Sequence, residues 1–114
     1  MKKEYQKLLY STIMALISVT LTAFLWPQPT ILLIILIVFT IIDFSIWQSK
    51  SDMLFYTASA ITGPIAELIA IINGAWNYTK PDLVFIPAWL ITCWGLWGVF
   101  MMRLHTVIKM KIKK

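Results

Sequence analysis

The stretch TILLIILIVFTIIDFSIW, residues 30–47, decides the class of fold. It contains a single charged residue, Asp43. A helix needs about 17–25 predominantly apolar residues to cross the hydrocarbon core of a bilayer. The stretch therefore predicts a transmembrane helix.

The composition of the whole chain agrees with a lipid solvent. Of the 114 residues, 60% are hydrophobic and only 13% are charged. Soluble domains are about 45–50% apolar and about 25% charged. A chain of this length could not hide so much apolar surface from water. An integral membrane protein is the class that remains.

Three other stretches have the length and composition of spans, at about 5–26, 53–74 and 85–104. The prolines of PQP at 27–29 end the first helix, and polar connectors at 48–52 and 75–84 separate the others. Pro87 is expected in the first turn of the last helix, where proline is tolerated. We predict an all-α fold, a four-helix bundle formed by a single transmembrane domain over 1–114, with a basic juxtamembrane tail at 105–114.

The basic residues predict the orientation. With four spans, nine of the ten Lys and Arg residues fall on one side of the membrane, and only Lys80 falls on the other. Lys and Arg collect on the cytoplasmic side, so both termini are predicted in the cytoplasm and the protein in the inner (cytoplasmic) membrane as a multi-pass protein. The nine residues are Lys2, Lys3, Lys7, Lys50, Arg103, Lys109, Lys111, Lys113 and Lys114.

The net charge of +5 does not point to nucleic acid, because the charges cluster at the ends of spans. Basic residues near a membrane surface each attract anionic headgroups by about 1 kcal/mol, so the tail is expected to bind lipid headgroups. The chain has one cysteine, Cys93, and one histidine, His105. No disulfide, metal site or cofactor is therefore expected.

Small residues mark the seams between membrane helices. The third span carries them at every fourth position. The second span has no such stripe, so we expect spans one, three and four to pack closely and span two to be more peripheral. The stripe is Ala58, Thr62, Ala66, Ala70 and Gly74.

Glu67 is the candidate catalytic residue. An acid inside a span is costly and is a functional-site hypothesis by default. Ser59, Gly63 and Glu67 form a row beside the small-residue stripe, so Glu67 is expected to face a helix seam. Pro64 removes a backbone hydrogen bond and could bend the helix to open a pocket. Two interpretations stay open, a functional pocket and a structural hydrogen bond between helices.

Aromatic and amide residues near Glu67 are the candidate ligand-binding groups. Asn73, Trp76 and Tyr78 are expected at the outer mouth of the pocket, and Trp94 and Trp97 inside the last span.

Asp43 is expected to form a structural ion pair with Lys50 or Arg103. The alternative is a proton relay to Glu67 through threonine hydroxyls, with Thr40, Thr57 and Thr62 as candidates.

The second half of the chain carries the pattern GPxxE…GAWxYxxP…IPxWL…WGxxG…RL. Its residues are Gly63, Pro64, Glu67, Gly74, Ala75, Trp76, Tyr78, Pro81, Ile86, Pro87, Trp89, Leu90, Trp94, Gly95, Gly98, Arg103 and Leu104. The pattern resembles a group of small, uncharacterised prokaryotic polytopic membrane proteins. It is also distantly similar to carotenoid hydratase and lycopene-cyclase-type membrane proteins.

The second resemblance implies an acid that acts on an alkene. Glu67 would then be the proton donor. The ring faces of Trp76, Tyr78, Trp94 and Trp97 would stabilise a carbocation.

Three functions follow from these features. The first is a lipid- or isoprenoid-binding or assembly module with a buried acid at Glu67. The second is a membrane enzyme acting on an isoprenoid or carotenoid-like alkene. The third is a small proton-coupled transporter that works as a dimer. Membrane lipid is the expected partner in each case, with a homo-oligomer or another membrane protein as a further one.

Overall fold

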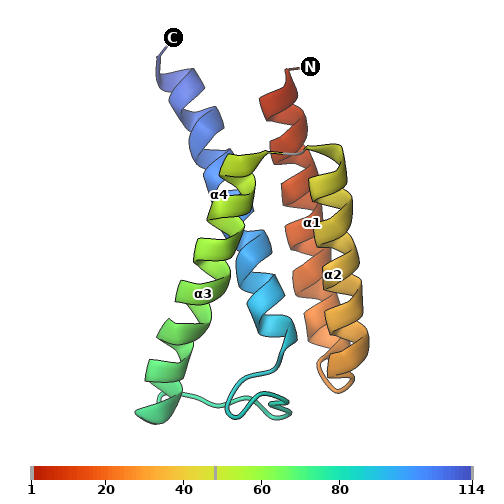
Figure 1. Cartoon of the computed structure of the whole chain (residues 1–114), viewed down its shortest axis with the longest axis vertical. Helices are drawn as coiled ribbons and strands as arrows, with labels where there is room; N and C mark the ends of the chain where they lie inside the picture. Colours follow the sequence, from red (N-terminus) through yellow and green to blue (C-terminus); the bar gives the residue numbers. More distant parts are fainter. Residues whose placement is uncertain (1, 48, 114) are drawn as a thin grey trace.

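The computed structural model describes residues 2–47 and 49–113, and these form four helices. They are α1 (Lys3–Leu25), α2 (Pro29–Ile46), α3 (Lys50–Ile72) and α4 (Trp89–Ile112). The first turn of α1 and the last turn of α4 lie at the same end of the bundle (Figure 1). Gln48 of the predicted connector and Lys114 of the predicted tail lie outside the described residues.

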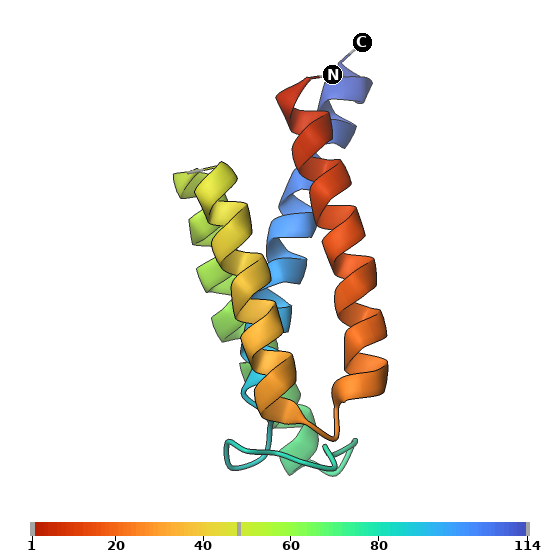
Figure 2. The ribbon, with the colours of Figure 1, turned by 90° about the vertical axis from the view of Figure 1, so that its right-hand side faces the viewer.

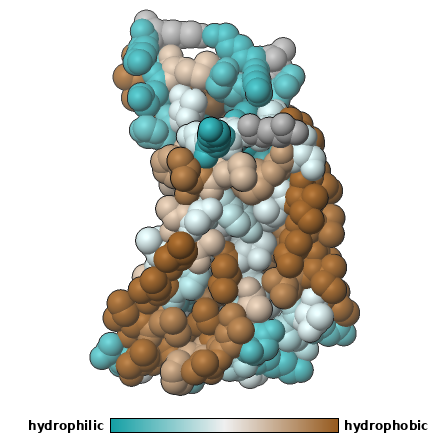
Figure 3. Space-filling view, in the orientation of Figure 1, coloured by the Kyte–Doolittle hydropathy of each residue, from teal (hydrophilic) through white to brown (hydrophobic). Residues whose placement is uncertain are grey.

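All four helices are long and apolar enough to cross a membrane. Many of their exposed side chains are large and apolar, as with Phe24 and Leu54, which are 77% and 70% exposed. Figure 3 shows apolar residues over α2 and the lower part of α3, with polar residues gathered at the two ends of the bundle. This distribution is that of a multi-pass membrane protein.

The start of α4 differs from the expectation. The backbone N–H groups of Leu83 and Ile86 each donate to the carbonyl of the other, at 2.8 and 2.7 Å, which closes a tight turn. Asp82 then accepts a hydrogen bond from the N–H of Ala88 at 2.6 Å. The helix therefore begins at Trp89, four residues later than predicted, and Pro87 precedes it instead of lying in its first turn. At its other end α4 continues through the predicted tail to Ile112.

The central helix is α4, which contacts each of the other three (Figures 1 and 2). The prediction that spans one, three and four pack closely, with span two more peripheral, holds only in part. The last span packs on α1 and α3, but Leu32 and Leu36 of α2 are also fully buried in a cluster with Trp89 and Leu90 of α4. A helix that is apolar all round does not show in its sequence which face is packed.

The packed face of α3 is not the predicted small-residue stripe. Ala58, Thr62 and Ala66 are exposed, and the neighbouring row that contains Gly63 contacts α4. A Cβ atom on Gly63 would lie 2.0 Å from Cδ2 of Trp94. The missing side chain is therefore what allows the indole of α4 to lie against the backbone of α3.

Candidate functional site

Glu67 of α3 accepts hydrogen bonds on both carboxylate oxygens. The hydroxyl of Tyr78 donates to Oε1, and Nε1 of Trp94 donates to Oε2 at 2.5 Å. One donor comes from α4 and the other from the connector between α3 and α4. A single acid therefore links both elements to α3.

Tyr78 is held on two sides. Its ring meets that of Trp89 edge to face, with ring centroids 6.1 Å apart. Burial, and then the hydrogen bond to Glu67, raise the pKa of Tyr78 above its usual value. The phenol therefore stays protonated and serves as the donor to the carboxylate.

Trp94 has three separate contacts with α3. Glu67 accepts from its indole, Oγ of Ser59 donates to its carbonyl at 2.7 Å, and Gly63 leaves room for its ring. Its orientation is thereby fixed. The indole forms a rigid wall between the two helices.

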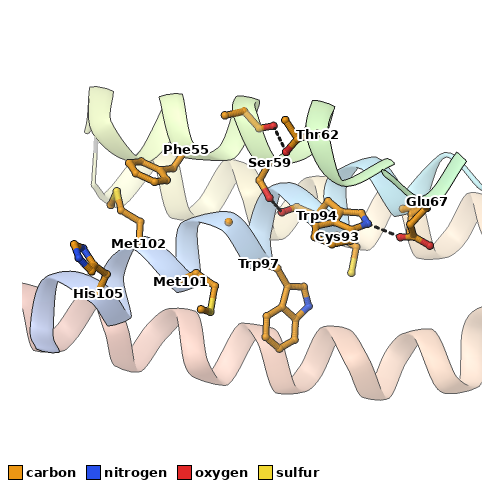
Figure 4. A pocket seen from close by; sticks show the side chains of 13 residues that line it. Phe55, Ser59, Thr62, Glu67, Cys93, Trp94, Trp97, Met101, Met102 and His105 are labelled. Atoms are coloured by element: carbon orange, nitrogen blue, oxygen red, sulfur yellow. Dashed lines mark hydrogen bonds between the residues drawn. The ribbon is translucent and has the colours of Figure 1, made fainter. Parts of the chain in front are cut away.

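Beside this wall lies a groove between α3 and α4 with a volume of about 880 Å³. Most of its lining is apolar, including Phe55, Trp97 and Met101. Glu67 lies at one end and His105 at the other (Figure 4). Ala58 and Thr62 form part of the wall on α3 and are exposed, so the feature is a surface groove and not a closed core cavity.

The structure brings together some of the predicted site residues. Glu67, Trp94 and Trp97 line the groove, and Tyr78 reaches the carboxylate of Glu67 from the connector.

Two others lie apart from the groove. Asn73 is exposed and its Nδ2 donates to the carbonyl of Ile69 at 2.8 Å. Trp76 is 49% exposed in the connector.

The structure contains features that match both interpretations of Glu67. The acid forms hydrogen bonds with two elements, as a structural role requires, and it also lines a groove, as a functional role requires.

A second polar centre lies around Arg103 of α4, which is 2% exposed. Its Nη1 and Nη2 atoms donate to the two oxygens of Asp43 at 2.8 and 2.6 Å. This confirms the predicted ion pair of Asp43 with Arg103. The guanidinium also lies over the ring of Trp47, 5.1 Å from its centroid, and donates to Oγ of Ser11 at 2.6 Å.

Asp52 is the member of this centre that the sequence reasoning missed. It was assigned to a polar connector, yet it lies in the first turn of α3 and is fully buried. Its Oδ2 lies 2.9 Å from Nη2 of Arg103 and 2.8 Å from Nζ of Lys7. The sequence does contain a signal for this helix start, the pattern Ser49-x-x-Asp52. In the structure the side chain of Ser49 accepts a hydrogen bond from the N–H of Asp52 at 3.3 Å. Ser-x-x-Asp before an apolar run is a helix-start pattern.

The two polar centres are separated along α4. Trp94 and Arg103 are nine residues apart, or about 13 Å by helix rise. Two of the threonines considered for a relay, Thr57 and Thr62, are exposed and donate to carbonyls of their own helix. Thr40 is within 3.2 Å of the hydroxyl of Tyr56.

No protein-family model, curated protein or solved structure matches the chain.

Proposed function

We propose that the protein binds the apolar chain of a lipid or isoprenoid in the groove between α3 and α4. The observation that carries the proposal is the chemistry of the groove wall. Its two hydroxyls are already used, since Ser59 donates to the carbonyl of Trp94 and Thr62 to that of Ala58. The middle of the groove is mostly apolar and therefore suits hydrocarbon, and its titratable groups Glu67 and His105 lie at the two ends.

The position of the groove on the molecule also supports a lipid or isoprenoid chain as its occupant. The groove opens on the outer surface of a helix pair that is long and apolar enough to cross a membrane. Its lining includes exposed apolar side chains such as Phe55 and Met101. A lipid chain could enter sideways from the bilayer without crossing a polar layer.

Glu67 in this proposal is a positioning residue. It orients Trp94, which is one wall, and Tyr78, which closes the same end from the connector. The enzyme alternative would need Glu67 to give a proton to an alkene. A carboxylate that accepts a hydrogen bond on each oxygen is arranged as an acceptor, which favours binding over that chemistry.

We also propose that the end of the bundle with both termini faces the cytoplasm, in the inner membrane. Lys7, Lys50 and Lys109 belong to that end. Lys80 belongs to the other end and donates to the carbonyl of Pro27. The bias of basic residues supports this orientation, which places Glu67 in the outer half of the membrane.

The test is organic extraction of the purified protein followed by mass spectrometry. Thr62→Trp fills the groove from its exposed wall, and Ile61→Trp adds the same bulk at the adjacent position, which does not line the groove. We expect a defined apolar molecule with the wild type and with Ile61→Trp, reduced at least tenfold with Thr62→Trp. Equal amounts in all three proteins would contradict the proposal.

A second copy of the chain is the competing occupant. If it filled the groove, Thr62→Trp would convert a dimer to a monomer and leave the extracted lipid unchanged. Measuring the mass of the same samples in detergent separates this outcome from lipid binding.

A further inference from the structure

The groove does not end at its apolar portion. Along α4, Trp97, Met101, His105, Lys109 and Lys113 follow one another at intervals of four residues, so successive members are neighbours on the helix surface. The first two line the groove, and the last two line a second hollow of about 260 Å³. His105 lines both. The apolar groove thus adjoins a basic hollow at a single shared side chain.

The chemistry of the second hollow suits an anion. Two ammonium groups and an imidazole line it, together with Thr106 and Met110, and its lining contains no carboxylate. Among the described residues, the ion pairs of the chain involve only Lys7 and Arg103 as cations. The ammonium groups of Lys109 and Lys113 are therefore available to a ligand.

The two ends of the groove differ in charge. At the far end lies the carboxylate of Glu67, whose oxygens already accept two hydrogen bonds. An anionic headgroup finds no free donor there, whereas the ammonium groups of Lys109 and Lys113 attract it at the other end. An amphiphile with a negative headgroup can therefore lie in the groove in one direction only.

The lengths are compatible with such a ligand. The groove lining on α4 extends from Leu90 to His105, which is about 22 Å by helix rise. Half of the hydrocarbon core of a bilayer is about 15 Å thick. The groove therefore accommodates a long chain that passes the midplane, while the lysines lie beyond the apolar part of α4 at the level of headgroups.

We propose that the ligand is an anionic lipid with a phosphate headgroup. The phosphate contacts His105, Lys109 and Lys113, and the chain runs along the groove toward Glu67. The assignment rests on the proposed function, because the chain must occupy the groove for the headgroup to be placed there.

The test is a binding titration of the full-length protein in detergent, followed by native mass spectrometry. The probes are a monoacylglycerol phosphate, the uncharged monoacylglycerol with the same chain, and inorganic phosphate. The variant is Lys109→Gln, and its matched control is Lys111→Gln, which removes the same charge from the same helix turn but does not line the hollow.

We expect Lys109→Gln to weaken the phosphate lipid about fivefold, and the double variant with Lys113→Gln about 25-fold. The uncharged lipid should bind all these proteins equally, and Lys111→Gln should behave as the wild type.

Three results would overturn the headgroup assignment. One is equal binding of charged and uncharged lipid by the wild type. The second is an equal loss in Lys111→Gln, which would indicate diffuse attraction. The third is inorganic phosphate that binds as tightly as the lipid, which would indicate a site for a soluble anion. Failure of both lipids to bind, with no effect of Thr62→Trp, would instead overturn the proposed function.

Discussion

Glu67 of α3 and Trp94 of α4 are joined by a 2.5 Å hydrogen bond from the indole Nε1 to the carboxylate Oε2. The bond links an acid within a predicted span to the side chain that forms one wall of the groove. It holds this wall in place beside a groove of about 880 Å³ between the two helices. A polar contact fixes the wall, and the space next to it remains apolar.

Removing this donor should loosen the pair of helices. Trp94→Phe keeps an aromatic side chain but loses the indole N–H and leaves one oxygen of Glu67 without its donor, so we expect a loss of about 1–3 kcal/mol of stability. Unfolding by SDS titration in mixed micelles measures it. Trp97→Phe is the control in the same groove, and a loss as large as that of Trp94→Phe would contradict a specific role for the Glu67 contact.

Gly63 should tolerate no side chain while Trp94 is present. A Cβ atom would lie 2.0 Å from the indole, and overpacking of this kind costs about 1–3 kcal/mol. Gly63→Ala is therefore expected to destabilise the wild-type protein. In the Trp94→Leu background the same substitution should change stability little. A double-mutant cycle measures the coupling, and strictly additive effects would show that the close approach is not formed.

Substitution of Arg103 should lower the stability of the protein more than any of the other substitutions named above. Arg103→Gln leaves Asp43 and Asp52 buried at 3% and 0% exposure without their shared cation. Breaking a buried pair in this way costs about 3–5 kcal/mol. Lys109→Gln removes an exposed charge from the same helix and should change stability by less than about 1 kcal/mol. Equal effects of the two variants in the SDS titration would contradict the ionic centre.

Tyr78 gives a prediction for alkaline pH. Its pKa in the folded protein is raised by burial and by the hydrogen bond to Glu67, whereas in the unfolded chain it is about 10. The stability that it contributes is therefore complete below pH 10 and decreases as the pH rises above that value. Tyr78→Phe should show a smaller loss of stability between about pH 10 and pH 11 than wild type or Tyr5→Phe, and an identical alkaline loss in all three would exclude this role.

The sequence was sufficient to predict the spans because length and apolar composition decide membrane insertion. Packing faces could not be predicted so well, because in lipid both the packed and the outward faces are apolar. This is why α2, with its buried Leu32 and Leu36, was expected at the periphery.

The candidate site was predicted only in part. An acid in a span is conspicuous, so Glu67 and the nearby tryptophans could be selected. The burial of Asp52 depends on where α3 begins, and the position of His105 between two hollows depends on how far α4 extends. Neither boundary is marked by a change in hydropathy.

The most direct test of chain binding in the groove uses the single cysteine of the protein. Cys93 lies in the groove wall, so its alkylation by a small maleimide in detergent reports on occupancy without any engineered label. We predict that a monoacylglycerol phosphate slows the alkylation of the wild type and of Ile61→Trp. In Thr62→Trp the reaction should be slow already and insensitive to lipid. An alkylation rate that does not change when saturating lipid is added to the wild type would contradict the account.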